Sequence, residues 1–213
     1  MSAIAIFGGT GYAGGHIAAE ATKRGHHVTS YSRSLPEKGL PGVTYVIGSL
    51  ADAETVATAA AGNDVVVLAV RGLDVDGEPL VDRLPMIIGA VAGHARLGVV
   101  GGASSSLVTP GGHRLLDTPD FHEEWKPEAT SHAAVLAALQ ADRSELDWFY
   151  VSPAALFGAF FPGEDTGHYR TGDDLLVIKD DGSSEISGTD FARAFVDEID
   201  TPRHHNRRFT VGH

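Results

Sequence analysis

The stretch Met1-Ser-Ala-Ile-Ala-Ile-Phe-Gly-Gly-Thr-Gly-Tyr-Ala-Gly-Gly-His16 decides the fold of this chain. Its apolar run, residues 4–7, is typical of a buried parallel strand and ends abruptly in glycine. Residues 9–14 then fit G-x-G-x-x-G, a spacing that lets the backbone turn tightly and approach a pyrophosphate closely. A helix predicted over residues 12–24 would present free N–H groups to that anion. The stretch therefore predicts a dinucleotide site, with an ordinary glycine-rich turn as the alternative.

Strands and helices are expected to alternate along the chain. The predicted strands are residues 4–7, 28–32, 43–47, 63–70, 97–100, 146–152 and 208–211, and the predicted helices are residues 12–24, 51–61, 78–93, 131–143 and 189–198. Residues 65–70 are continuously apolar, so this strand should lie at the centre of the sheet. The pattern predicts an α/β fold, a doubly wound parallel sheet of the NAD(P)-binding Rossmann type with small C-terminal elements on the substrate side.

Two details of the C-terminal third follow from local signals. Residues 175–178 and 184–186 are expected to pair as a hairpin across the Asp180-Asp-Gly182 turn. Thr189 and Asp190 are expected to cap the last helix. The irregular residues 109–127 are long enough to indicate a functional loop, interpreted as part of a roof over the substrate.

Size and charge exclude several kinds of protein. A chain of 213 residues suits one large domain, and we expect residues 1–213 to form it. The formal net charge of −12 disfavours nucleic-acid and anionic membrane partners. The absence of cysteine removes disulfides, thiolate nucleophiles and cysteine-based metal sites. With no signal peptide and no apolar run of about 20 residues, the expected location is the cytoplasm.

The predicted cofactor residues fall into three groups. The pyrophosphate is expected at the turn and first helical residues, which are Gly8, Thr10, Gly11, Tyr12 and Ala13. Ala69, Val70 and Arg71 end the central strand and should form the floor of the crevice. Arg33 follows the second strand, where an acid would bind the ribose of NAD and an arginine accommodates the 2′-phosphate of NADP. NADP is therefore preferred and NAD remains possible, while a solvated loop arginine is the alternative role for Arg33.

Five segments carry a family resemblance: the glycine motif at 8–14, Ser32-Arg33, and residues 99–104, 148–153 and 190–194. Together they resemble the atypical short-chain dehydrogenase/reductase superfamily, over essentially the whole chain. Residues 187–192 and 207–212 resemble its NADH-flavin-reductase-like group, which is related to NmrA-like and biliverdin-reductase-B-like proteins. The resemblance implies an NAD(P)H-binding Rossmann fold and reductase activity.

The chain departs from that superfamily in two places. No tyrosine is followed four residues later by lysine, so the usual proton-donating Tyr-x-x-x-Lys pair is missing. Ser49 stands where family members often carry an aspartate that binds adenine. Hydride transfer to a flavin or another conjugated acceptor tolerates the first loss, because the accepting ring delocalises charge and water can supply the proton.

Candidate residues for catalysis and substrate binding are few. Ser104 and Ser105 follow a central strand and could orient an acceptor, or serve only as a loop or cap. His132 shares a helical face with apolar residues, so it is either a core histidine or a proton donor. Tyr169 and Arg170 could close over a substrate or flank a structural hairpin. The histidines show no metal-binding spacing, so no metal is expected.

Three functions are compatible with these residues. The first is an NAD(P)H-dependent reduction of a small planar acceptor such as a flavin or quinone, by a monomer or homodimer. The second is a non-catalytic NADP sensor that resembles NmrA-like regulators. The third is an epimerase or dehydratase that uses a displaced acid such as Tyr150.

Overall fold

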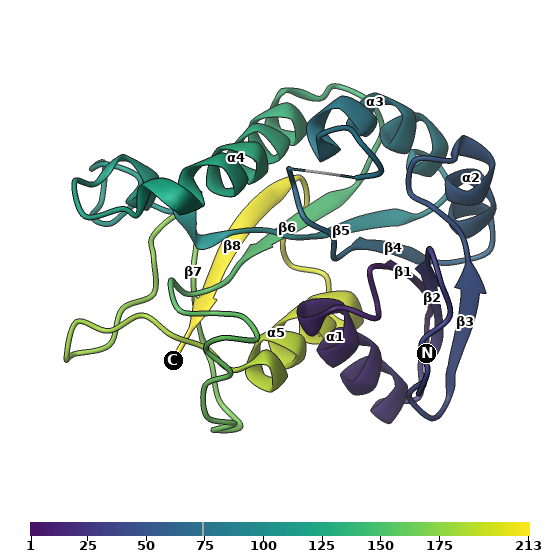
Figure 1. The fold of residues 1–213 in the computed structure, drawn as a ribbon, viewed down its shortest axis with the longest axis horizontal. Coiled ribbons are helices and arrows are strands. Elements are labelled where there is room, and N and C mark those ends of the chain that lie inside the picture. The colour runs from purple at the N-terminus through teal and green to yellow at the C-terminus, as the bar shows by residue number, and fades with distance from the viewer. Residues whose placement is uncertain (74) are drawn as a thin grey trace.

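The computed structural model describes residues 1–73 and 75–213, and it is built on one eight-stranded sheet (Figure 1). The strands are β1 Ala3–Phe7, β2 His27–Ser32, β3 Val43–Ile47, β4 Val65–Leu68, β5 Arg96–Val100, β6 Trp148–Ser152, β7 Arg170–Gly172 and β8 Arg207–Gly212. Their spatial order is β3-β2-β1-β4-β5-β6-β8-β7, and only β7 is antiparallel to its neighbour. This is the predicted doubly wound fold, with β4 in the centre as expected.

The order of the strands reverses between β1 and β4. From β1 the chain moves outward to β2 and β3, and then returns to place β4 on the other side of β1. In open parallel sheets, ligands bind outside the carboxyl ends of the strands at such a reversal. A ligand site is therefore expected at the segments that follow β1 and β4.

Helices cover both faces of the sheet (Figure 1). One face carries α2 Ala53–Ala61, α3 Leu80–Val91 and α4 Lys126–Ala141, and the other carries α1 Tyr12–Lys23 and α5 Gly188–Asp200. The side chains of β1 point alternately into two hydrophobic cores, one on each face of the sheet. Ile4 and Ile6 pack with α1 and α5, whereas Phe7 packs on the opposite face. This alternation explains why β1 is apolar throughout, since a strand covered on both faces has no solvated side.

Two glycines allow α1 to lie close to the β1 turn. Gly8 has a φ of 90°, and a Cβ on it would lie 2.8 Å from the carbonyl carbon of Ala69 at the end of β4. A Cβ on Gly14 would lie 2.8 Å from the carbonyl carbon of Gly8. Only glycine fits both places without moving backbone. The first turn of α1 is therefore held directly against the ends of β1 and β4.

The C-terminal third differs from its predictions. The expected hairpin forms only at its turn, where the Lys179 N–H donates to the Ser183 carbonyl at 2.8 Å. Beyond the turn Leu175 bridges to Leu107 and Glu185 to Leu156, so the two segments pair with other parts of the chain. The strand β7 was not predicted. The cap of α5 is Ser187 rather than Thr189 or Asp190, and α4 begins at Lys126, five residues before the expected start.

Candidate dinucleotide site

A cavity of about 340 Å³ opens at the carboxyl ends of β1, β2, β3 and β4. This volume lies in the usual range of ligand pockets. Seven of the predicted cofactor residues line it: Gly8, Thr10, Gly11, Arg33, Ala69, Val70 and Arg71. Residues far apart in sequence are thus brought to one cavity by the reversal of strand order.

The N-terminus of α1 faces this cavity without any cap from the protein. Its N-cap is Gly11, which has no side chain to accept a hydrogen bond, and its first turn carries no acidic residue. The first N–H groups of a helix have no acceptor within the helix, so those of Tyr12 and Ala13 are available to a ligand. A helix start of this kind fits an anion such as a pyrophosphate, because the N–H groups and the positive end of the dipole both favour negative charge.

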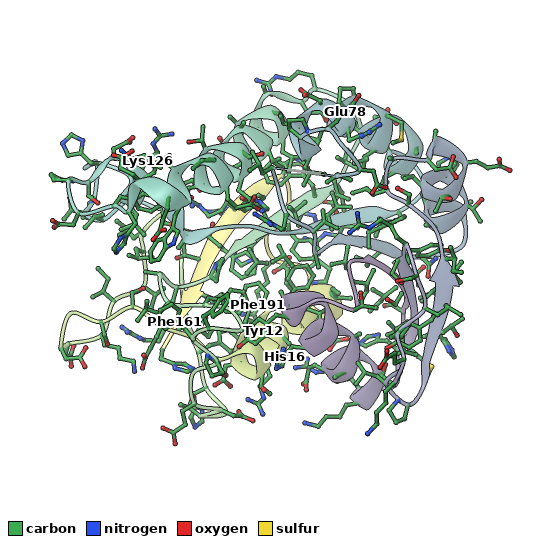
Figure 2. The ribbon with its side chains drawn as sticks, viewed as in Figure 1. Tyr12, His16, Glu78, Lys126, Phe161 and Phe191 are labelled. Carbon is green, nitrogen blue, oxygen red and sulfur yellow. The ribbon has the colours of Figure 1, made fainter. Side chains whose placement is uncertain are left out.

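The side chain of Tyr12 points away from the cavity, toward the start of α5. Its hydroxyl accepts a hydrogen bond from the Gly188 N–H at 3.1 Å and donates to the Pro162 carbonyl at 3.2 Å. Its ring packs edge-on against His16 and Phe157, and Figure 2 shows Tyr12 and His16 on the α1 side of the sheet. Burial raises the pKa of this phenol. Only the backbone N–H of Tyr12 is therefore positioned to bind a ligand in the cavity.

An acid that the sequence analysis missed lies at the mouth of the cavity. Asp76, on the loop between β4 and α3, lies 3.1 Å from Nη1 of Arg33 and accepts a hydrogen bond from the hydroxyl of Ser49. All three residues line the cavity. The Asp76-Gly77 dipeptide was a turn signal in the sequence, but nothing local indicated which residues the aspartate would meet.

The start of the same loop is fastened to α4. The carboxylate of Glu128 accepts hydrogen bonds from the N–H groups of Gly72 at 2.7 Å and Leu73 at 3.1 Å. Ser131 donates to the carbonyl of Gly72. Burial alone would raise the pKa of Glu128, but the hydrogen bonds from His132 and from the Gly72 N–H lower it to about 2. A charged Glu128 thus fixes the cavity wall beyond Arg71, and the sequence analysis did not identify it.

The three candidate catalytic side chains do not line the cavity and are buried among protein partners. Ser104 donates to the Ala129 carbonyl at 3.4 Å, and Ser105 accepts from Arg208 at 3.5 Å. Nε2 of His132 lies 3.4 Å from Glu128, and its buried Nδ1 has no hydrogen-bond partner among the described residues. In this arrangement His132 supports the Glu128 contact rather than facing a ligand.

Three further candidates also lie outside the cavity. Tyr150 is fully buried, its hydroxyl donates to the His132 carbonyl at 3.2 Å, and burial raises its pKa. Tyr169 donates to Asp197 of α5, and burial raises its pKa as well. Arg170 donates to the carbonyls of Ile178 and His213. Each polar group is engaged in holding elements of the C-terminal half together.

No group of three His, Asp or Glu side chains within residues 1–73 and 75–213 is arranged to hold a metal ion. None of the helices in this part of the chain combines the length and apolar character needed to cross a bilayer.

A parallel sheet with a glycine turn and an uncapped helix at its reversal point defines a dinucleotide-binding protein of the Rossmann class. Residues 8–202 match the family described as NAD(P)H-binding, and the chain belongs to that family. The resemblance to the atypical short-chain dehydrogenase/reductase group is thereby confirmed.

Three solved structures are similar over nearly their full lengths. A Streptococcus pneumoniae protein is 33% identical with a TM-score of 0.88, covering 100% of this chain and 99% of its own. A Burkholderia pseudomallei protein is 38% identical with a TM-score of 0.84, covering 100% of both. A Bacteroides thetaiotaomicron protein is 31% identical with a TM-score of 0.86, covering 99% and 96%. Their names all carry the qualifier "putative": NADH-flavin reductase, exported protein and epimerase, respectively.

Proposed function

We propose that this protein is an NAD(P)H-dependent oxidoreductase that reduces a small planar acceptor such as a flavin or quinone, with NADPH as its preferred cofactor. The observation that carries the proposal is the uncapped start of α1, which opens on a cavity that also contains Arg33. The name of the similar S. pneumoniae protein supports the reductase class.

Different residues of the cavity would bind different parts of the cofactor. The N–H groups of Tyr12 and Ala13 would hold the pyrophosphate, and Gly8 and Gly11 leave room for it to approach the backbone. The guanidinium of Arg33 would pair with the 2′-phosphate. The nicotinamide supplies the hydride when the cofactor is bound, and the chain supplies position and charge.

The burial of the candidate proton donors favours a particular kind of acceptor. Ser104, His132 and Tyr150 are all at least nine-tenths buried and contact other parts of the protein. An isolated carbonyl would need a proton from such a group as the hydride arrives. A flavin or quinone spreads the negative charge over its ring and can take the proton from water. The same burial argues against an epimerase that uses Tyr150 as its acid.

A non-catalytic NADP sensor is the second candidate, and the same observation favours it. A sensor needs the cavity but no proton donor facing a substrate. It would bind the nucleotide without oxidising it. Turnover therefore separates the two functions.

We further propose a cytoplasmic monomer or homodimer whose partner is the small acceptor. The net charge of −12 supports the absence of nucleic-acid and membrane partners, since both bind through clustered positive charge.

The test combines binding with turnover. Purified protein is titrated with NADPH and NADH, and NADPH oxidation is then followed with FMN, FAD and quinones added in turn. Arg33→Ala should weaken NADPH binding by about tenfold and leave NADH binding nearly unchanged, because only NADPH carries the 2′-phosphate. Arg143→Ala, which removes an exposed arginine from the end of α4, is the matched control.

The results of binding and turnover together distinguish the two proposed functions. Turnover of an acceptor together with the Arg33→Ala effect supports the reductase. Tight binding without turnover on any acceptor replaces it with the sensor. Binding of neither nucleotide would overturn both.

A further inference from the structure

The loop between β4 and α3 carries a hydrogen-bonded turn at residues 75–78. The Val75 N–H donates to the Glu78 carbonyl at 2.7 Å, and the Glu78 N–H returns a bond at 3.4 Å. Between them, Asp76 and Gly77 have φ values of 52° and 89°, and positive φ at both central positions is what a type I′ turn requires. The direction of the Asp76 side chain is therefore set by a defined turn.

The turn is anchored on both sides. Val75 is buried in the core that α2, α3 and α4 share with the sheet. Arg83 of α3 donates to the backbone carbonyl of Asp76 at 3.3 Å. These contacts fix the backbone of the turn, so that Asp76 lines the cavity while its side chain stays partly exposed to solvent.

Both oxygens of the Asp76 carboxylate have partners from the ends of other strands. One lies 3.1 Å from Nη1 of Arg33 after β2, and the other accepts the hydroxyl of Ser49 after β3. The hydrogen bond from Ser49 and the charge of Arg33 hold the pKa of this carboxyl below its usual range. Asp76 is thus ionised at neutral pH, and Arg33 already has an anionic partner.

We propose that Asp76 is a specificity-determining residue that restrains the preference for NADP over NAD. A 2′-phosphate must take Arg33 from Asp76 and then lie beside a second negative charge. A ribose 2′-hydroxyl can instead donate a hydrogen bond to the carboxylate, which is the contact that NAD-binding sites obtain from an acid after the second strand. Here the acid comes from a different loop, 43 positions after Arg33 by residue number.

This inference rests on the proposed nucleotide site, and calorimetric titration with NADP⁺ and NAD⁺ tests the two separately. Asp76→Asn keeps the size of the side chain, and asparagine tolerates positive φ, so the turn should survive. Removing one charge next to a phosphate should raise the ratio of the NAD⁺ to the NADP⁺ dissociation constant by about tenfold. Thermal unfolding of each variant checks that the fold is intact.

The matched control is Glu78→Gln, which removes an acid from the same turn. Glu78 lies 3.3 Å from Arg83, and Figure 2 shows it beside α3 at the outer edge of the molecule. In Glu78→Gln the ratio of the NAD⁺ to the NADP⁺ dissociation constant should change by less than about twofold, because the charge of Glu78 lies farther from Arg33. An unchanged ratio in Asp76→Asn, or an equal rise in Glu78→Gln, would overturn the role of Asp76 while leaving the nucleotide site standing. Failure of the wild type to bind either nucleotide would remove the site and the inference together.

Discussion

The helices α1 and α5 pack side by side on one face of the sheet, yet they begin in opposite ways (Figure 1). The start of α1 is Gly11, which offers no cap and faces the cavity. The start of α5 is Ser187, whose hydroxyl accepts from the N–H of Asp190. The fully buried Asp190 carboxylate in turn accepts from the Thr166 N–H at 2.9 Å and lies 2.9 Å from His213.

The difference shows how one physical property serves two purposes. Both helix starts carry free N–H groups and a positive dipole end. At α5 two of these N–H groups are bonded within the protein: Asp190 donates to the hydroxyl of Ser187, and Gly188 donates to the hydroxyl of Tyr12. The Asp190 carboxylate then ties Thr166 and His213 to the helix. At α1 no protein group takes that place, so a ligand anion can. We therefore expect substitutions at α5 to act on stability and substitutions at α1 to act on binding.

The largest effect is expected at the start of α5. Asp190→Ala removes the buried carboxylate, which leaves His213 without its acidic partner and Arg193 with Asp165 alone, so the free energy of unfolding should fall by about 3 kcal/mol in urea titrations. Asp180→Ala, at an exposed turn, should change it by less than about 0.5 kcal/mol. A loss at Asp190 no larger than at Asp180 would show that the α5 network is not a source of stability.

A smaller loss of stability, but a large loss of binding, is expected at the start of α1. In Gly14→Ala the new methyl group would lie 2.8 Å from the Gly8 carbonyl carbon, so the turn must move, at a cost of about 2 kcal/mol. NADPH affinity should fall by about tenfold or more, because the N–H groups lose their alignment. The neighbouring Gly15→Ala meets its nearest atom at 3.6 Å and should retain binding. Equal binding by the two variants would contradict the assigned role of the close approach.

The smallest expected effect concerns the wall of the cavity. Glu128 has a pKa of about 2 in the folded protein against an ordinary 4.5, so its charge stabilises the fold above pH 4.5, and this contribution is lost as the pH falls toward 2. Glu128→Gln should remove about 1 kcal/mol at neutral pH and flatten the pH dependence of stability across that window. Parallel pH profiles of urea unfolding for the wild type and the variant measure this. Profiles that differ only by a constant offset would show that Glu128 is not the titrating group.

The sequence predicted the half of the molecule around α1 far better than the half around α5. The strand, the turn and the helix at residues 3–23 are contiguous, so local pattern and spacing were enough to indicate them. The alternation of elements also predicted the parallel sheet and the central position of β4. Gly8, Arg33 and Ala69 meet at one cavity because that topology places strand ends together.

What could not be predicted depends on contacts between distant segments. Asp76 meets Arg33 and Ser49 only because three loops converge at the sheet edge. Residues 175–178 and 184–186 had the pattern of a hairpin and its turn forms, but beyond the turn their backbone groups bond to Leu107 and Leu156. Ser105 was a candidate to orient the acceptor because it is polar and follows a central strand. Its partner Arg208 lies 103 positions away, and this contact holds the serine inside the protein.

The most direct test of the account is a crystal structure of the protein with NADPH. We predict pyrophosphate oxygens within hydrogen-bond distance of the N–H groups of Tyr12 and Ala13, with the 2′-phosphate on Arg33 in place of Asp76. Nucleotide bound elsewhere, or a pyrophosphate that makes no contact with the first turn of α1, would contradict the claim that this helix start is reserved for a ligand.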